Sequence, residues 1–340
     1  MNEKIKVAVI GGGFSNERDI SLMTAQQIAA ALPADKYDVS LIEITPEKVW
    51  LLRDDFKQLS EAGSGAELIA LDPQNPTLRN AADVVFIALH GKFGEDGRIQ
   101  AIFDMLDIPY TGSGVLASAL GMNKAKCQEI LKHYELNIPP YLLLTKLPDI
   151  NELDKIINET IKYPAVVKPN ESGSSVGISI AKNKEQLDGA VTAAFKEDSS
   201  VMIQQYVAGR ELTCAVMGNS TDNELEALPP IEIIAHADFF DYQTKYFSES
   251  TEEICPADIS PELTTEIQKQ SKVSHLALGC DGLTRSDFIL NDGNLYFLEI
   301  NTIPGQTAAS LSPKAARAAG LSFTQFIEKQ IGLALKKARS

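Results

Sequence analysis

A glycine- and serine-rich segment, KPNESGSSVGIS at residues 168–179, is the first pattern in the chain that could do chemistry. It lies between two apolar, strand-like runs at 164–167 and 176–180. Small residues leave backbone amides open and tolerate unusual dihedral angles, so such a loop can surround an oxyanion with N–H groups. Lys168 at its base would add a positive charge. A flexible hairpin tip explains the same residues, so the segment alone leaves both interpretations open.

A second group of polar residues lies in two strand-like runs joined by the turn sequence NDGN at 291–294. Because side chains alternate along a strand, Arg285 and Asp287 share one face of the first run. The same rule puts Glu299 and Asn301 on one face of the second. Carboxylate and amide oxygens suit Mg²⁺, which also takes phosphate and water. The alternative is a solvated edge hairpin, but the apolar residues on the opposite faces favour the metal site.

The length of the turn decides whether the two polar faces coincide. A two-residue turn pairs Asn291 with Asn294 and puts Asp287 and Glu299 on opposite faces. A three- or five-residue loop shifts the pairing and brings both carboxylates to one face. We therefore predict an odd-numbered loop, with a positive φ angle that Gly293 adopts most easily.

The elements that must position these residues predict an α/β protein of three domains. The run KIKVAVI at 4–10 resembles a buried parallel strand and ends at glycines, after which helices and strands alternate. We predict a doubly wound N-terminal domain over 1–122, with a site at the carboxyl ends of its strands. A central domain at 123–207 holds the glycine-serine loop, and a C-terminal domain at 208–340 holds the polar hairpin. The glycines do not spell GxGxxG, so a dinucleotide fingerprint is absent.

The composition is that of an ordinary soluble protein. The chain has 340 residues, of which 44% are hydrophobic and 23% charged, enough for two or three domains. A net charge of −15 argues against nucleic acid and against anionic membranes as partners. The four cysteines show no CxxC spacing, which indicates reduced thiols and a cytoplasmic location. The sequence contains no apolar run long enough to span a membrane.

Five motifs in order closely resemble those of the D-alanine–D-alanine ligases, a family of the ATP-grasp superfamily. They are HGKFGEDG, YTGSGVLASALGMNK, VVKPNESGSSVGIS, DYQTKYFSES and RSDFILNDGNLYFLEINTIPGQTAASL. The resemblance spans nearly the whole chain. It implies an α+β ATP-grasp fold, in which an N-terminal α/β domain precedes two ATP-grasp domains that hold the nucleotide between two sheets. The glycine-serine loop is then a flap that closes over phosphate.

The resemblance also implies an activity. Such ligases join two D-alanines with ATP through an acyl phosphate, for peptidoglycan precursors, and use two Mg²⁺ or Mn²⁺ ions. The metal ligands would be Asp287, Glu299 and Asn301. We expect a cytoplasmic homodimer whose partners are D-alanine and ATP.

The resemblance also implies substrate-binding roles for further residues. Glu17 matches the carboxylate that holds the ammonium of the first D-alanine, and His90 lies beside that substrate. Arg285 and the amide of Gly305 would stabilise the oxyanion. Ser310 and the amide of Leu311 would bind the carboxylate of the second substrate. The catalytic hydroxyl groups of Ser174 and Tyr246 would form hydrogen bonds with Glu17.

The ATP site implied by the resemblance includes lysines, the flap and a hinge. The residues concerned are Lys124, Lys168, Lys245, Ser174, Ser175, Gln204, Gln205, Tyr206, Val207, Glu211 and Phe239. Many relatives carry Glu then Lys where this chain has Gln204 and Gln205. A glutamine can still accept a hydrogen bond from the adenine amino group, so ATP is expected and nucleotide selectivity stays open.

Two other functions fit parts of the pattern. Sister ligases that make D-alanyl-D-lactate or D-alanyl-D-serine share the metal and phosphate sites. Tyr246 is the residue type of the dipeptide-forming enzymes, which favours D-alanine. A non-catalytic nucleotide-binding regulator on the same fold would have little reason to keep Arg285 and all three metal ligands.

Overall fold

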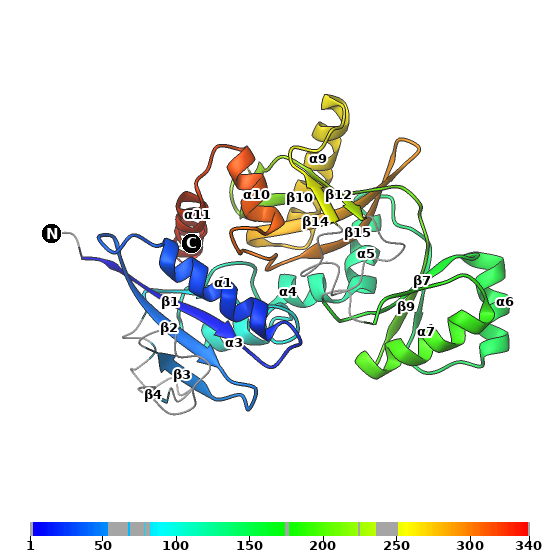
Figure 1. Ribbon diagram of the computed structural model, residues 1–340, viewed down its shortest axis with the longest axis horizontal. Helices are drawn as coiled ribbons and strands as arrows, with labels where there is room; N and C mark the ends of the chain where they lie inside the picture. The colour runs from blue at the N-terminus through cyan, green and yellow to red at the C-terminus, as the bar shows by residue number, and fades with distance from the viewer. Residues whose placement is uncertain are drawn as a thin grey trace.

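The computed structural model describes residues 3–53, 67–68, 78, 82–173, 177–223, 225–235 and 251–338. Within these ranges the strands form three sheets, located in the N-terminal, central and C-terminal parts of the chain (Figure 1). None of the helices in these ranges is long and apolar enough to cross a bilayer.

The N-terminal sheet has the strand order β4-β3-β2-β1-β5. Strands β2, β1 and β5 run parallel, whereas β3 and β4 extend the sheet with antiparallel pairs. Helices α1 and α11 pack on one face and α3 on the other, which confirms the predicted doubly wound arrangement. The bounds are β1 (Ile5–Gly12), β2 (Tyr37–Ile44), β3 (Trp50–Arg53), β4 (Glu67–Leu68), β5 (Val84–Ile87), α1 (Arg18–Ala31), α3 (Arg98–Met105) and α11 (Phe323–Lys337).

The apolar run that begins the chain is explained by burial on both faces of the sheet. Val7 and Val9 of β1 belong to the core under α1 and α11, and Ala8 and Ile10 belong to the core under α3. Successive side chains of a strand point to opposite faces, so positions 7–10, which helices cover on both sides, all carry apolar residues. The site must therefore lie at the strand ends.

The central sheet is antiparallel, with the order β6-β9-β7-β8. Its strands are β6 (Tyr141–Leu144), β7 (Ala165–Pro169), β8 (Ser179–Ala181) and β9 (Val201–Gln205), and helices α6 (Ile150–Thr160) and α7 (Lys184–Glu197) share its core. Strand β8 thus begins three residues later than the run at 176–180 predicts. Helices α4 (Val115–Met122) and α5 (Lys124–Lys132) precede this sheet.

The C-terminal sheet has the order β13-β12-β10-β14-β15, with β11 also paired to β10. All of its pairs are antiparallel. Helices α5 and α9 share the core on one face, whereas α10 and α11 share the core on the other. The bounds are β10 (Arg210–Asn219), β11 (Glu226–Ala227), β12 (Ile231–Ala235), β13 (Thr251–Ile254), β14 (Asp281–Asn291), β15 (Asn294–Asn301), α9 (Pro261–Ala277) and α10 (Leu311–Ala318).

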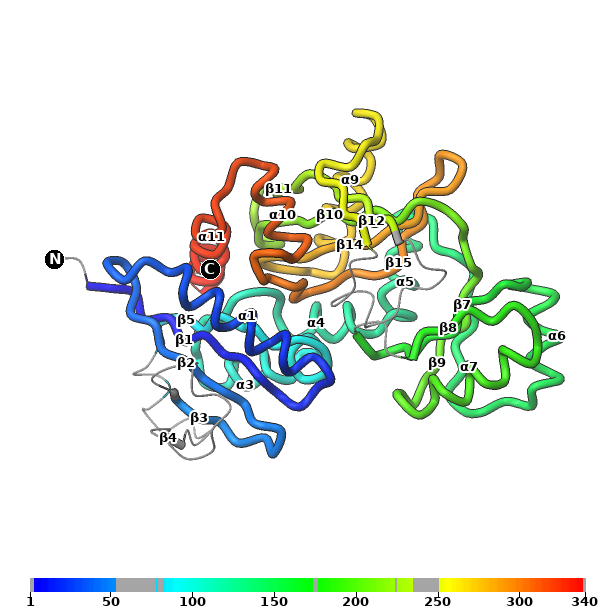
Figure 2. Tube along the Cα trace, in the orientation of Figure 1, coloured from blue at the N-terminus to red at the C-terminus, as the bar shows by residue number. Residues whose placement is uncertain are grey.

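The last helix joins the two ends of the chain. Phe326, Ile327 and Ile331 of α11 are buried in one core with Val84 and Phe86 of the N-terminal sheet. The same core includes residues of β10 and β14, so α11 lies between the first and third sheets, as Figure 2 shows. This shared core holds the N-terminal strand ends beside the C-terminal sheet.

Candidate active site

The turn between β14 and β15 has two residues, so the predicted odd-numbered loop was wrong. Asn291 pairs with Asn294, and Asp292 and Gly293 have φ angles of 46° and 79°. Two consecutive positive φ angles are the signature of a turn whose twist matches that of the flanking strands. Glycine meets this requirement without strain, and aspartate is among the side chains that tolerate it best.

A β-bulge in the hairpin restores the arrangement that the turn alone would break. Phe288 pairs with Phe297, but Asp287 pairs with Glu299, so Leu298 is an extra residue in β15. Arg285 then lies opposite Asn301. The prediction that the four polar residues share one face is therefore confirmed, and its cause is the bulge.

Asp287 is the most heavily hydrogen-bonded member of this face. Its two oxygens accept from Arg285 Nε and Nη2, each at 3.0 Å. Oδ1 also accepts from Thr213 Oγ1 at 2.5 Å, and Oδ2 accepts from Asn301 Nδ2 at 3.0 Å. Four donors occupy the lone pairs of a carboxylate, so the Asp287 side chain is held in a single orientation.

Two buried lysines from other elements approach Glu299 at the end of the same face. Lys124 Nζ lies 3.6 Å from Glu299 Oε2 and donates to the carbonyl of Ser172 at 2.6 Å. Burial lowers the pKa of Lys168 to about 8, the charge of Glu299 opposes that shift, and the charge of Lys124 adds to it. Two cations beside one carboxylate form a positive site that the net negative chain builds locally, as phosphate binding requires.

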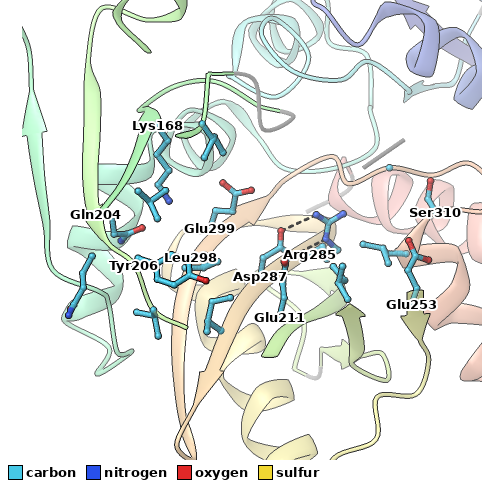
Figure 3. A pocket seen from close by; sticks show the side chains of 18 of the residues that line it. Lys168, Gln204, Tyr206, Glu211, Glu253, Arg285, Asp287, Leu298, Glu299 and Ser310 are labelled. Atoms are coloured by element: carbon cyan, nitrogen blue, oxygen red, sulfur yellow. Dashed lines mark hydrogen bonds and ion pairs between the residues drawn. The ribbon is translucent and has the colours of Figure 1, made fainter. Parts of the chain in front are cut away.

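A cavity of about 340 Å³ lies between the central and C-terminal sheets. Lys168 and the hinge, which is residues 204–207, face it from one side, and Arg285, Asp287 and Glu299 face it from the other (Figure 3). Apolar side chains line the part beside the hinge, which suits a planar base. The predicted residues that line it are Lys168, Gln204, Gln205, Tyr206, Val207, Glu211, Arg285, Asp287, Glu299, Gly305, Ser310 and Leu311.

One end of the cavity is closed by the N-terminus of α10. Ser310 precedes the helix, and its Oγ accepts from the amide of Thr307 at 3.1 Å and lies 2.8 Å from Thr307 Oγ1. Leu311 is the first helical residue, so its amide lies at the positive end of the helix dipole, where a carboxylate is favoured. A Cβ added to Gly305 would lie 3.1 Å from Ser310 Oγ, so the chain passes closely here.

Glu17 and His90 form a separate group at the N-terminal strand ends. Glu17 is buried at the residue before α1, and its carboxylate lies against Gly91, where an added Cβ would be 2.6 Å from Oε2. His90 is buried, with Nε2 3.3 Å from Thr24 Oγ1. Neither residue lines the main cavity. The predicted contact of both residues with the first D-alanine stays a prediction.

Glu95 is a carboxylate that sequence analysis did not single out, although it lies within HGKFGEDG. Its Oε2 accepts from the amide of Gly91 at 2.7 Å. Burial, and next the nearby charge of Glu17, raise the pKa of Glu95 to about 8. The amides of Gly91 and Ile303 and the charge of Arg285 oppose the shift. A pKa near 8 leaves Glu95 mostly protonated at neutral pH, and an ammonium group bound beside it would favour loss of that proton.

Glu95 also connects this acidic group to the hairpin. A small adjoining cavity of about 30 Å³ is lined by Glu95, Lys124, Glu299 and Asn301. Sequence analysis likewise missed Glu253 of β13, which lines the main cavity and forms an ion pair with Lys314 of α10. The sequence signal for Glu253 is weak, because an acidic residue in a short strand is usually an ordinary solvent-exposed residue.

Five predicted residues lie outside the part of the chain that the structure describes: Ser174, Ser175, Phe239, Lys245 and Tyr246. Among the described residues, no three His, Cys, Asp or Glu side chains are grouped as metal ligands would be. The predicted metal site has only two carboxylates, Asp287 and Glu299, and completes its oxygen donors with the amide of Asn301.

Comparisons with known proteins agree with this arrangement. The family model "D-ala D-ala ligase N-terminus" matches residues 6–113, and "D-ala D-ala ligase C-terminus" matches residues 130–332. A D-alanine–D-alanine ligase of Syntrophobacter fumaroxidans is 39% identical over 338 residues, covering 98% of this chain and 99% of the relative.

Two solved structures have the same fold over nearly the whole chain. The VanG D-Ala:D-Ser ligase of Enterococcus faecalis has a TM-score of 0.87 at 33% identity, covering 98% of this chain and 100% of its own. The D-alanine–D-alanine ligase of Bacillus anthracis complexed with ATP has a TM-score of 0.77 at 31% identity, with coverage of 98% and 99%. The polar hairpin, the cavity between two sheets and the matched sequence all lead to one conclusion: the chain belongs to the D-alanine–D-alanine ligase family.

Proposed function

We propose that this protein joins two D-alanines into D-alanyl-D-alanine at the expense of ATP. The observation that carries the proposal is the shared face of Arg285, Asp287 and Glu299, which lines the same cavity as the hinge at 204–207. If the base of ATP binds at the hinge, its phosphate groups point toward the two buried lysines and the two carboxylates. The relatives named above act on D-alanine, and one of them binds ATP in this fold, which supports the proposal.

A divalent cation fits the donors of the hairpin. Asp287, Glu299 and Asn301 present oxygen atoms, which Mg²⁺ or Mn²⁺ prefer, and triphosphate and water would complete the coordination of two such ions. Because Asp287 already accepts four hydrogen bonds, one donor must leave when a cation binds. Arg285 is the charged donor among them and the one that competes most directly with a cation. Bound metal would neutralise the triphosphate and so favour transfer of its terminal phosphoryl group.

The remaining residues perform the two steps of amide formation. A carboxylate oxygen of the first D-alanine attacks the γ-phosphorus of ATP, and ADP leaves. Lys124 and Lys168 hold the transferred phosphoryl group, while Glu17 holds the substrate ammonium and His90 lies beside it. The amine of the second D-alanine then attacks the acyl carbon, and phosphate leaves.

Several groups stabilise the second step. Arg285 and the amide of Gly305 donate to the oxyanion, and each such donor typically contributes about 10²–10³ in turnover. Ser310 and the Leu311 amide hold the second carboxylate. The proposal also includes residues that lie outside the described ranges: Ser174, Ser175 and Lys245 at the phosphate, Tyr246 with Glu17, and Phe239 at the base.

The choice of the second substrate is the finer part of the proposal. Because the chain is similar to a D-Ala:D-Ser ligase, D-serine is one alternative second substrate, and D-lactate is the other. The test is ADP release by the purified protein with Mg²⁺-ATP, with D-alanine alone and with added D-lactate or D-serine. We expect D-alanine alone to suffice and the dipeptide to be the product. A depsipeptide as the main product near neutral pH would overturn the substrate assignment, and no ADP release at all would favour a non-catalytic regulator.

The cellular setting follows from the same proposal. The dipeptide is a peptidoglycan precursor, so the protein would act in cell-wall synthesis in the cytoplasm, as a homodimer without nucleic-acid or membrane partners. Light scattering of the purified protein would give its mass, and a monomer at working concentration would contradict the dimer.

A further inference from the structure

The amide of Gln204 is held by a chain of hydrogen bonds that begins far from the hinge. Gln204 is buried at the end of β9, and its Nε2 donates to Gln128 Oε1 at 2.9 Å and to the carbonyl of Pro139 at 3.3 Å. A primary amide has two hydrogens, so these two acceptors use both. The polar atom that remains is Oε1, which can only accept. Figure 3 shows this oxygen on the side of the cavity, which Gln204 lines.

The direction of this chain is fixed at both ends by backbone carbonyls. Gln128 is fully buried in α5, and its Nε2 donates to the carbonyl of Leu298 at 2.7 Å. A carbonyl cannot donate, so the atom of Gln128 nearest Leu298 must be its nitrogen, and its oxygen must face Gln204. The carbonyl of Pro139 sets the Gln204 amide by the same reasoning. Reversing either amide would place two acceptors against each other in a buried site.

We propose that Gln128 is a positioning residue that makes this site select 6-aminopurine over 6-oxopurine nucleotides, by holding Gln204 Oε1 toward the base as an acceptor. The inference rests on the proposed function in one respect, the placing of the base at the hinge. The 6-amino group of adenine donates to such an acceptor. The 6-oxo group of hypoxanthine or guanine has only lone pairs there and would meet a second acceptor.

The anchor of the chain also connects base recognition to the metal face. Leu298 is the extra residue of the bulge that brings Glu299 opposite Asp287. Gln128 therefore contacts the backbone at the point that sets the register of the metal ligands. A substitution that merely loosened this packing would weaken the binding of all nucleotides equally. Loss of the amide orientation would instead change the preference between bases.

The test measures the affinities of ADP and IDP with Mg²⁺ by calorimetry, without amino acid. For the natural sequence we expect ADP to bind about tenfold to a hundredfold more tightly than IDP, the range for one buried polar mismatch. Gln128→Met removes the shorter of the two contacts that orient the Gln204 amide and leaves only the longer one to Pro139, so the ratio of the two dissociation constants should fall severalfold toward one. Gln128→Lys, which only donates, should draw the Gln204 oxygen away from the base and favour IDP.

A double variant and a control separate orientation from packing. In Gln128→Lys with Gln204→Glu, one carboxylate oxygen meets the ammonium and the other faces the base, so preference for ADP should return. Glu129→Gln, on the exposed face of the same helix, should leave the ratio unchanged. If Gln128→Lys does not fold, Gln128→Met decides the question.

The inference would be overturned if Gln128→Met weakened the binding of ADP and IDP equally, or if the natural protein showed no preference for ADP. Dipeptide synthesis by the natural protein tests the proposed function separately, because nucleotide binding here requires no turnover.

Discussion

Asp287 and Glu299 lie directly opposite each other on neighbouring strands because Leu298 is inserted between Glu299 and the regular part of the hairpin. Without this extra residue, the two-residue turn at Asp292 and Gly293 would send the two carboxylates to opposite faces of the sheet. The metal ligands and Arg285 therefore depend on one bulge, which is a common device for aiming side chains at a site.

The first prediction concerns the charge of Glu299. Glu299→Gln keeps the size of the side chain but removes the charge that a metal ion and two lysines require. We expect turnover to fall by at least about a hundredfold while the protein still folds and unfolds cooperatively. ADP release measures turnover, and circular dichroism measures unfolding.

The matched control is Glu266→Gln, which removes a carboxylate from the exposed side of α9. It should leave turnover unchanged. Near-natural activity in Glu299→Gln would show that the metal assignment is wrong.

The second prediction concerns the contact between Gly91 and Glu17. Gly91 has a φ angle of 70°, and a Cβ there would lie 2.6 Å from Glu17 Oε2. Because the carboxylate is buried, Gly91→Ala should displace it and raise the KM for D-alanine at the first site by about tenfold or more, with nucleotide affinity retained. Steady-state kinetics against D-alanine and calorimetry with ADP measure the two effects.

Gly320→Ala is the control for backbone strain. Gly320 has a φ angle of 89° but nothing lies within 4 Å of an added Cβ. Both variants carry a similar backbone penalty, so only the collision with Glu17 distinguishes them. A matching rise in KM in both would mean that the contact with Glu17 has no role in substrate binding.

Sequence patterns could predict the features of the fold that depend on local periodicity. The apolar run in β1 and the alternation of Arg285 with Asp287 both follow from the two-residue period of a strand. The motifs of the family then supplied the order of the sheets. The turn of the hairpin was predicted wrongly, although the pairing of Asp287 with Glu299 was predicted correctly, because one inserted residue at Leu298 has no local signature. The register is set by pairing with β14 and by packing around Phe288 and Phe297.

Other parts of the site depend on contacts distant in sequence. Gln128 lies beside Glu129 in a short helix that also carries three lysines, a pattern typical of a surface residue, yet α5 buries it against Leu298, which is 170 positions away. The packing of α11 on the N-terminal sheet is a long-range contact of the same kind. Neither follows from periodicity, since both are decided by which elements the fold brings together.

The third prediction tests the paired geometry of Arg285. Arg285→Lys keeps the positive charge but loses the planar fork of N–H donors that contacts Asp287 and would donate to the oxyanion. We expect turnover to fall by about 10²–10³, the loss typical of one oxyanion donor. The control is Arg210→Lys on β10, where Arg210 makes the same two-bond contact with Glu232, at 2.6 and 2.7 Å. If the two variants lose activity equally, the effect belongs to the sheet and not to the reaction.

The last prediction concerns pH and the carboxyl group of Glu95. Its pKa is raised to about 8 in the folded protein, chiefly by burial and next by the charge of Glu17. In the unfolded chain the pKa is near the ordinary value of about 4.3. Between these values the folded state binds a proton that the unfolded state has lost, so stability falls as pH rises from about 4.3 to about 8.

Glu95→Gln removes this titration, because its amide resembles the protonated acid. The unliganded variant should therefore melt close to the natural protein at pH 5 and at a higher temperature than the natural protein at pH 9, with the difference growing through the interval. Differential scanning calorimetry at half-unit steps of pH measures it. Glu252→Gln, at an exposed position on β13, is the matched control and should show no such growth. A difference between Glu95→Gln and the natural protein that stays constant from pH 5 to pH 9 would mean that Glu95 is already ionised in the fold, and that Glu17 and Glu95 hold two negative charges side by side before any ammonium group arrives.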